Sequence, residues 1–290
     1  MDAVLLACLA ALGFGALAVA VRVGFRRVDE PLLAALCITT VGCALVAVLA
    51  AATGAFASFD LADAAVFAAI GALVPGLSQL LFVRAVRDAG PSRAAIVIGT
   101  APIISAALAV AFLDEPLGPA LAIATVLIVA GGALFAWEPA RPAGFRMIGV
   151  ILALVCALLF AVRDNLVREA AERAELAPLA ATTATLVGAL LALGLVALAT
   201  RPGAWRRLSL ASVAAAFVPA GLCLGLAYAA LIEAFDRGRV TVVAPLNATQ
   251  SLWAVLLAAL ILGRTEAIGR RLVLAAVLVV AGGALIGVTR

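Results

Sequence analysis

Three polar side chains that can form hydrogen bonds share one face of an apolar segment near the C-terminal end of the chain. Asn247, Gln250 and Ser251 stand at positions i, i+3 and i+4, the spacing that places side chains on one stripe of a helix. Trp253 follows three residues after Gln250 and would add an aromatic wall beside the stripe. Polar groups inside a membrane are costly and usually face protein or a water-filled path. The stripe is therefore a candidate wall of a solute-binding cavity.

A structural role for the same residues stays open. Ser, Thr, Asn and Gln also hydrogen-bond between the helices of membrane bundles, each contributing roughly 1 kcal/mol or less. An internal duplication, described below, places Thr100 opposite Ser251 in the symmetry-related helix. Polar groups from both halves would then line one cavity or hold two helices together.

Further solute-binding candidates lie close to prolines. Ser78 and Gln79 follow Pro75, and Tyr228, the only tyrosine, falls near Gln79 when the two halves are aligned. A proline leaves one carbonyl of its helix without the usual partner, and a solute or a water can use it. The competing role of these side chains is helix packing around the bends.

One helix of the second half carries charges where the first half has none. Its apolar run from residue 147 to 162 is too short to span a bilayer, so the helix is expected to continue through Arg163, Asp164 and Asn165. The equivalent positions of the first half are apolar. These three residues and Glu233 are our candidates for coupling or gating.

The sequence favours a different interpretation of these charges, in which the helix emerges into water. Asp164 with Arg168, and Glu169 with Arg173, have the i, i+4 spacing of salt-bridged surface helices. Arg163 would extend its guanidinium to the membrane interface. The same spacing recurs near other helix ends, in Arg84 with Asp88 and in Glu233 with Arg237.

The chain lacks the residue patterns of common catalytic and metal sites. It has no histidine, and its five cysteines lie in apolar runs without a CxxC pair. It also lacks a glycine-rich phosphate loop and paired carboxylates within an apolar run. We expect no catalytic residue, no metal ligand, no cofactor and no enzymatic activity. The net charge of +4 does not indicate nucleic acid, because the arginines are spread over the connections without forming a basic patch.

The elements that must position these residues are transmembrane helices. Hydrophobic residues make up 67% of the 290 residues and charged residues only 12%, far from the composition of a soluble domain. Strict alternation of apolar and polar residues is absent, which excludes barrel strands. Ten apolar runs are long enough to span, at residues 3–21, 31–52, 61–83, 94–113, 117–137, 147–167, 179–199, 212–232, 240–262 and 272–288.

The two halves of the chain are related by duplication. With an offset of 151 residues, Val-Ala-Gly-Gly-Ala-Leu at 129–134 matches the identical sequence at 280–285. Five helices per repeat is an odd number, so the second repeat enters the membrane upside down, as in many alternating-access carriers. We therefore predict an all-α integral membrane protein of ten transmembrane helices, with inverted five-helix repeats at residues 1–142 and 143–290 around a central cavity.

The repeated motifs resemble the EamA-type permeases of the drug/metabolite transporter superfamily. Each repeat of that family has an alanine-to-glycine turn into its fourth helix, a proline, an acidic end to that helix and a glycine-rich fifth helix. The matching residues are Ala85 to Gly90, Pro102, Asp114-Glu115 and Gly131-Gly132 in the first half, and Ala234 to Gly238, Pro245, Gly263 to Glu266 and Gly282-Gly283 in the second. One departure is Trp253, which stands where the repeat frame puts a proline.

The resemblance implies a basket of helices that moves a small-molecule solute by rocking of the two repeats. Its YddG-like members export amino acids and related metabolites, and we take amino-acid export as the expected function. The expected setting is the lipid bilayer of a bacterial inner membrane, with the monomer as the working unit and no nucleic-acid partner. The alternatives are a subunit that translocates a lipid-linked sugar, which predicts an arginine-lined lateral opening, and a structural membrane protein without transport activity.

The orientation of the chain receives conflicting indications. Fourteen of the 20 arginines belong to the odd-numbered connections, which by the positive-inside rule places those connections in the cytoplasm and both termini outside. Relatives of the EamA type usually keep both termini in the cytoplasm. For this chain we favour the arginine distribution.

Overall fold

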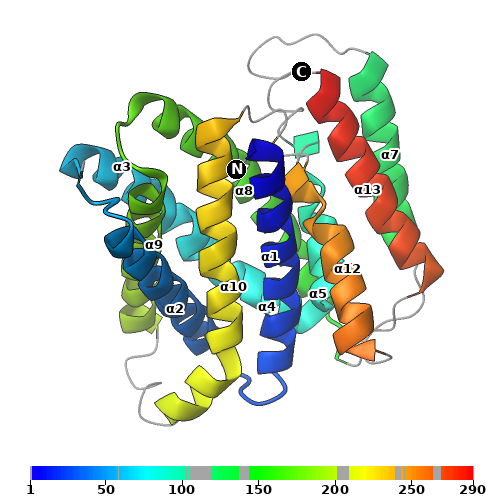
Figure 1. The fold of residues 1–290 in the computed structure, drawn as a ribbon. Helices are drawn as coiled ribbons and strands as arrows, with labels where there is room; N and C mark the ends of the chain where they lie inside the picture. Colours follow the sequence, from blue (N-terminus) through cyan, green and yellow to red (C-terminus); the bar gives the residue numbers. More distant parts are fainter. Residues whose placement is uncertain are drawn as a thin grey trace.

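The computed structural model describes residues 2–57, 59–101, 103–104, 119–136, 144–200, 209–238, 243, 246–263 and 269–289. Within these residues the chain forms helices and no strand (Figure 1). The helices are α1 (Ala3–Gly24), α2 (Pro31–Ala52), α3 (Leu61–Gly71), the π-helix η1 (Ala72–Leu77), α4 (Ser78–Ala89), α5 (Pro91–Ile98), α7 (Pro119–Ala136), α8 (Met147–Arg173), α9 (Pro178–Thr200), α10 (Leu210–Arg237), α12 (Gln250–Ile261) and α13 (Arg270–Thr289).

The all-α prediction is confirmed, and six helical spans in the described residues are long and apolar enough to cross a membrane. They are α1, α2, the continuous run from α3 to α4, α8, α9 and α10. The other four predicted spans contain α5, α7, α12 and α13, and the total of ten stays a prediction. The motif residues Pro102, Glu115, Pro245 and Glu266 lie outside the described residues.

Local sequence explains where several helices begin and bend. Proline is the first residue of α2, α5, α7 and α9, a position where its missing N–H costs nothing. Asp60 caps α3 by accepting hydrogen bonds from the backbone N–H groups of Ala62 and Asp63. Pro75 coincides with the bend between α3 and α4, where Val74 leaves the helical conformation. Pro219, by contrast, lies within the continuous helix α10.

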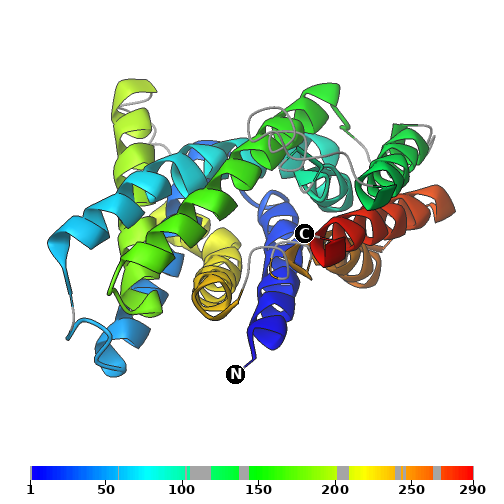
Figure 2. The ribbon, with the colours of Figure 1, turned by 90° about the horizontal axis from the view of Figure 1, so that it is seen from above.

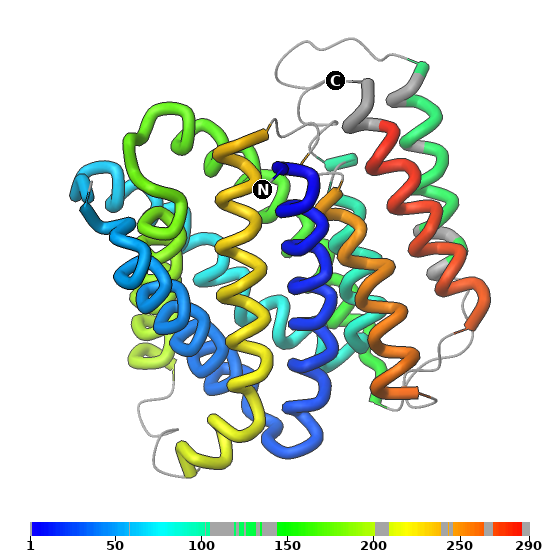
Figure 3. Tube along the Cα trace, in the orientation of Figure 1, coloured from blue at the N-terminus to red at the C-terminus, as the bar shows by residue number. Residues whose placement is uncertain are grey.

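Helix α1 is antiparallel to α10 along its whole length. Gly13 lies against Ala227 near the middle of both helices, and Gly24 lies against Phe217 at the other end of α1. The two helices stand side by side in Figure 3.

Helix α8 is instead parallel to α10. Arg163 donates a hydrogen bond to Tyr228, and Arg168, further along α8, donates to the carbonyl of Phe235 further along α10. Because α1 and α8 are the first helices of the two halves, the halves enter the bundle in opposite directions. This is the inversion expected from five helices per repeat.

The halves interlock through equivalent helix pairs. The first helix of each half packs along the third helical run of the other, α1 on α10 and α8 on α4, while the second helices α2 and α9 pack on each other. The last helices α7 and α13 pair at the periphery (Figures 1 and 2). Glycines permit that pairing, because Gly131 lies against Val279 and Gly282 against Ile128. Two copies of one packing scheme therefore build the bundle.

The closest crossing joins α3 and α9. A Cβ added to Gly71 would lie 1.9 Å from the carbonyl oxygen of Thr185, and one added to Gly188 would lie 1.9 Å from that of Ala68. Only glycine lets the backbones approach this closely.

Candidate solute site at mid-depth

A buried arginine holds together the centre of the bundle. The side chain of Arg163 on α8 is only 3% exposed. Its Nη1 donates to the hydroxyl of Tyr228 on α10 at 3.0 Å, and its Nε and Nη2 lie 2.9 and 2.8 Å from Oδ1 of Asp164. A guanidinium with charged and neutral partners of this kind is a strong, directional anchor.

Aromatic rings enclose the same guanidinium. Its carbon lies 5.0 Å from the ring centre of Phe160 and 5.5 Å from that of Tyr228, within the range of cation–π attraction. Phe14 of α1 packs edge-on against Tyr228, with ring centres 5.4 Å apart. Residues of both halves thus meet at this cluster, which we call the Arg163 cluster: Phe14, Phe160, Arg163, Asp164 and Tyr228.

The Arg163 cluster lies halfway along the bundle. Phe14 occupies the middle of α1, which runs from Ala3 to Gly24. At that depth a charge is expensive and is retained mainly on solute or ion pathways. Position and chemistry together make the cluster the strongest candidate site among the described residues.

This placement corrects the interpretation of α8 as a surface helix from Arg163 onward. Arg163 does not reach an interface, and Asp164 pairs with Arg163 instead of with Arg168. Arg168 pairs with Glu172. The expected pair of Glu169 and Arg173 is present, so the salt-bridged surface begins at residue 168. The i, i+4 prediction failed at Asp164 because its carboxylate pairs with the adjacent Arg163, whose guanidinium also donates to Tyr228.

The remaining gating candidates make local contacts. The amide Nδ2 of Asn165 donates to the carbonyl of Ala161 on its own helix at 2.8 Å. Glu233 accepts a hydrogen bond of 2.6 Å from Nε of Arg237, which is the pair predicted from spacing. Near the end of α4 the predicted pair of Arg84 with Asp88 is wrong, because Asp88 pairs with Arg87 at 2.9 Å.

Gln79 and Ser78 lie at the start of α4, beside the bend. Gln79 is buried, and its Nε2 has no hydrogen-bond partner within the described part of the chain. The hydroxyl of Ser78 lies 3.4 Å from the carbonyl oxygen of Pro75, so it uses the region that the proline perturbs. The carbonyl of Ser78 in turn faces the thiol of Cys156 on α8, at 3.6 Å. Gln79 is therefore the group here with unused hydrogen-bonding capacity.

The polar stripe before and within α12 divides into two kinds of residue. Asn247 is buried, and its Oδ1 has no partner among the described residues. The hydroxyls of Ser251 and Thr100 donate to carbonyls one turn back, at 3.1 and 2.7 Å, and so make no bond to each other. Gln250 is half-buried. Helices α5 and α12 do pack together, as the duplication predicts for the fourth position of each half.

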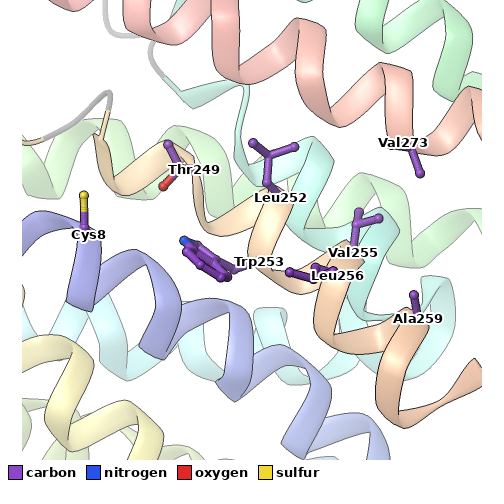
Figure 4. A pocket seen from close by; sticks show the side chains of 8 residues that line it. All are labelled: Cys8, Thr249, Leu252, Trp253, Val255, Leu256, Ala259 and Val273. Atoms are coloured by element: carbon purple, nitrogen blue, oxygen red, sulfur yellow. The ribbon is translucent and has the colours of Figure 1, made fainter.

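Trp253 lines a separate, apolar pocket. This pocket has a volume of about 590 Å³ and is lined by Cys8, Thr249, Leu252, Trp253, Val255, Leu256, Ala259 and Val273. Figure 4 shows the indole pointing toward α1. Two of its lining residues, Leu256 and Val273, are 49% and 44% exposed, so the pocket opens toward lipid. Trp253 thus borders a lipid-facing hollow, whereas Asn247 and Ser251 lie on the buried face of their helix.

Two buried polar residues, Ser92 and Arg93, were not predicted as site candidates from the sequence. Arg93, assigned there to a connection, is 2% exposed inside α5, and the adjacent Ser92 has a buried hydroxyl without a partner in the described chain. The available signal was Pro91, which marks a helix start and therefore places Arg93 in the first turn of a helix. Among the described residues no group of three His, Cys, Asp or Glu side chains is arranged to hold a metal ion.

Comparison with known proteins agrees with this architecture. The EamA-like transporter family matches residues 1–137 and 147–288, one copy for each half. The chain belongs to the EamA-like transporter family. Members of this family are membrane transporters of small solutes, so this EamA-like protein is an integral membrane protein that belongs to the general class of small-solute transporters.

Structural comparison supports the fold of the EamA-like protein. One solved crystal structure shares 22% sequence identity with it, with a TM-score of 0.68, and the match covers 98% of this chain and 95% of the other. No curated protein matches the sequence. At this identity the likeness concerns the fold alone.

Proposed function

We propose that this EamA-like protein exports small zwitterionic metabolites, amino acids foremost, by alternating access. The observation that carries the proposal is the Arg163 cluster, a buried cation at mid-depth where helices of both halves meet. A solute carboxylate is the natural partner for a guanidinium. In the state described here Asp164 occupies that place, so solute binding would exchange one carboxylate for another.

Unsatisfied buried groups support a solute that carries both signs of charge. The Nε2 of Gln79 is a donor without an acceptor, and the Oδ1 of Asn247 is an acceptor without a donor, within the described residues. An unpaired buried polar group costs about 1 to 3 kcal/mol. The carboxylate and ammonium groups of an amino acid would supply what each lacks. Gln79 lies on α4, Asn247 lies three residues before α12, and α5 packs against both of these helices.

The inverted halves provide the mechanism. Because α1 and α8 run in opposite directions and make equivalent contacts, a conformation open at one end implies a related conformation open at the other. We therefore propose that a central cavity beside the Arg163 cluster opens toward one end of the bundle and then toward the other as the halves rock.

Transport by purified protein tests the proposal. Proteoliposomes loaded with a panel of labelled amino acids are expected to release at least one of them faster than protein-free vesicles. Tyr228→Phe, which removes only the hydroxyl that Arg163 contacts, is expected to slow release. Arg173→Gln, on the exposed end of α8, is expected to leave the release rate unchanged. Release equal to that of empty vesicles for every zwitterion in the panel would refute the substrate class.

The alternative of lipid-linked sugar translocation predicts an arginine-lined lateral opening, through which the charged head group would have to pass from one side of the membrane to the other. The structure contains a lateral groove with arginines at one end of the bundle, but its wall continues with Leu80, Leu152 and Val196. A charged sugar-phosphate would lose its partners along such a wall. The groove therefore supports a different role.

A further inference from the structure

A groove of about 660 Å³ lies at the arginine-rich end of the bundle, between helix ends of both halves. It is formed by the N-terminal ends of α2 and α8 and the C-terminal ends of α4 and α9. Its lining residues are Glu30, Pro31, Leu32, Leu80, Arg84, Arg87, Asp88, Arg146, Ile148, Leu152, Val196 and Thr200.

Two arginines of the groove carry uncompensated charge. Arg87 is paired with Asp88 and lies 3.6 Å from Asp29. The exposed guanidiniums of Arg84 and Arg146 have no acidic or hydrogen-bonding partner within the described part of the chain. The rim therefore offers two cationic donors to an anion.

The arginines stand above an apolar wall. Leu80 precedes Arg84 by one turn of α4, and Ile148 and Leu152 follow Arg146 on successive turns of α8. Ile148 is 48% exposed, whereas Leu80 and Leu152 are half-buried against the core, so the wall opens to the membrane at Ile148. A groove with a cationic rim and an apolar wall is complementary to an amphiphile with an anionic head, not to a soluble anion.

We propose that this groove binds an anionic phospholipid, with the phosphate between Arg84 and Arg146 and an acyl chain along Leu80, Ile148 and Leu152. Basic recesses between transmembrane helices on the positive side of a protein have this capacity. Arg84 belongs to the first half and Arg146 to the second. The lipid thus bridges the two inverted halves and stabilises the arrangement that forms the groove. The site is independent of which solute is carried.

Lipid-dependent thermal unfolding of the full-length protein tests this proposal. The purified protein is titrated in detergent with phosphatidylglycerol, with phosphatidylcholine of identical chains, and with inorganic phosphate. Each groove arginine near an anionic surface is expected to contribute about fivefold in affinity. Phosphatidylglycerol should therefore raise the Tm more than phosphatidylcholine, and the double variant Arg84→Gln, Arg146→Gln should lose most of that difference.

The control variant is Arg173→Gln, an exposed arginine at the other end of α8 that is paired with Glu169, and it should keep the full difference. Equal stabilisation of wild type by both lipids, or an undiminished difference in the double variant, would overturn the proposal. A rise with inorganic phosphate alone that matches the phosphatidylglycerol effect would also overturn it, by showing a free-anion site. If the double variant does not fold, the test uses wild type alone at low and high salt. High salt should reduce the excess Tm increase that phosphatidylglycerol gives over phosphatidylcholine. A salt-independent excess would contradict an ionic site.

Discussion

Removing the partner of a buried charge and removing the whole pair should have opposite consequences at the Arg163 cluster. Asp164→Ala leaves the guanidinium of Arg163 in place, 3% exposed, with only the Tyr228 hydroxyl at 3.0 Å and two aromatic rings. The double variant Arg163→Met, Asp164→Ala removes the charge together with its partner. It keeps a long apolar side chain in the space of the arginine.

The magnitudes follow from burial. Breaking a buried ion pair on one side costs about 3 to 5 kcal/mol, because a charge is left uncompensated. The cation–π contacts with Phe160 and Tyr228 are already present in wild type, so they do not replace the lost carboxylate. Replacing both partners by apolar groups is often neutral or stabilising. We therefore expect the single variant to lose about 3 kcal/mol or more and the double variant to recover most of it.

Paired measurements of stability and transport test this reasoning. The Tm of purified wild type and variants, followed by loss of the folded peak in size-exclusion chromatography, should fall for Asp164→Ala by about 10 °C, at roughly 2 to 4 °C per kcal/mol. It should return toward wild type in the double variant. Transport should be lost in the double variant even though its fold is restored, because the cation that binds the solute is gone. A double variant as unstable as the single one would refute the burial argument, and a transport-active double variant would remove Arg163 from the site.

Three other outcomes are expected. Tyr228→Phe should lower stability by about 1.5 to 3 kcal/mol, the value of a hydrogen bond to a charged group, and should slow transport; an unchanged transport rate would contradict a role in solute binding. Gly71→Ala or Gly188→Ala should prevent folding, because either Cβ would lie 1.9 Å from a carbonyl oxygen of the facing helix. The control Gly194→Ala on α9, whose Cβ would have nothing within 4 Å, should fold like wild type. Equal yields of the three variants from detergent extracts would refute the close crossing. If the arginine distribution sets the orientation, a phosphatase fused to the C-terminus should be active, because it lies outside the cytoplasm. An inactive phosphatase fusion, together with fluorescence from a separate C-terminal fluorescent-protein fusion, would favour the orientation usual among EamA-type relatives.

Most of the helices could be predicted from the sequence because their causes are local. The start of α2 at Pro31 and of α8 at Met147, and the end of α2 at Ala52, agree with the predicted apolar runs. The continuation of α8 through Arg163 also followed from length alone, since its apolar run was too short to span. The boundary between the halves, placed at residues 142 and 143, stays a prediction.

The partners of polar side chains could not be predicted in the same way. Spacing along one helix pairs Asp164 with Arg168, yet a neighbouring helix offers Tyr228 to Arg163 and draws the carboxylate away. Thr100 and Ser251 were matched by symmetry, but each hydroxyl donates to a carbonyl three residues earlier in its own segment. Trp253 was placed beside a polar stripe, and it lines a lipid-facing pocket because its side chain leaves the helix on a different face.

The sequence by itself determined that this chain is a helical membrane protein and that it is duplicated, and it predicted that an odd number of helices inverts the second half. Those properties depend on composition, run length and repetition, which need no knowledge of contacts. Only the tertiary structure decided that Arg163 is buried at mid-depth and that Arg84 and Arg146, which have no ionic partner in the described chain, share a groove. The rotation and register of each helix are set by close approaches such as Gly13 on Ala227 and Gly71 on Thr185, and these are made between residues far apart in the chain.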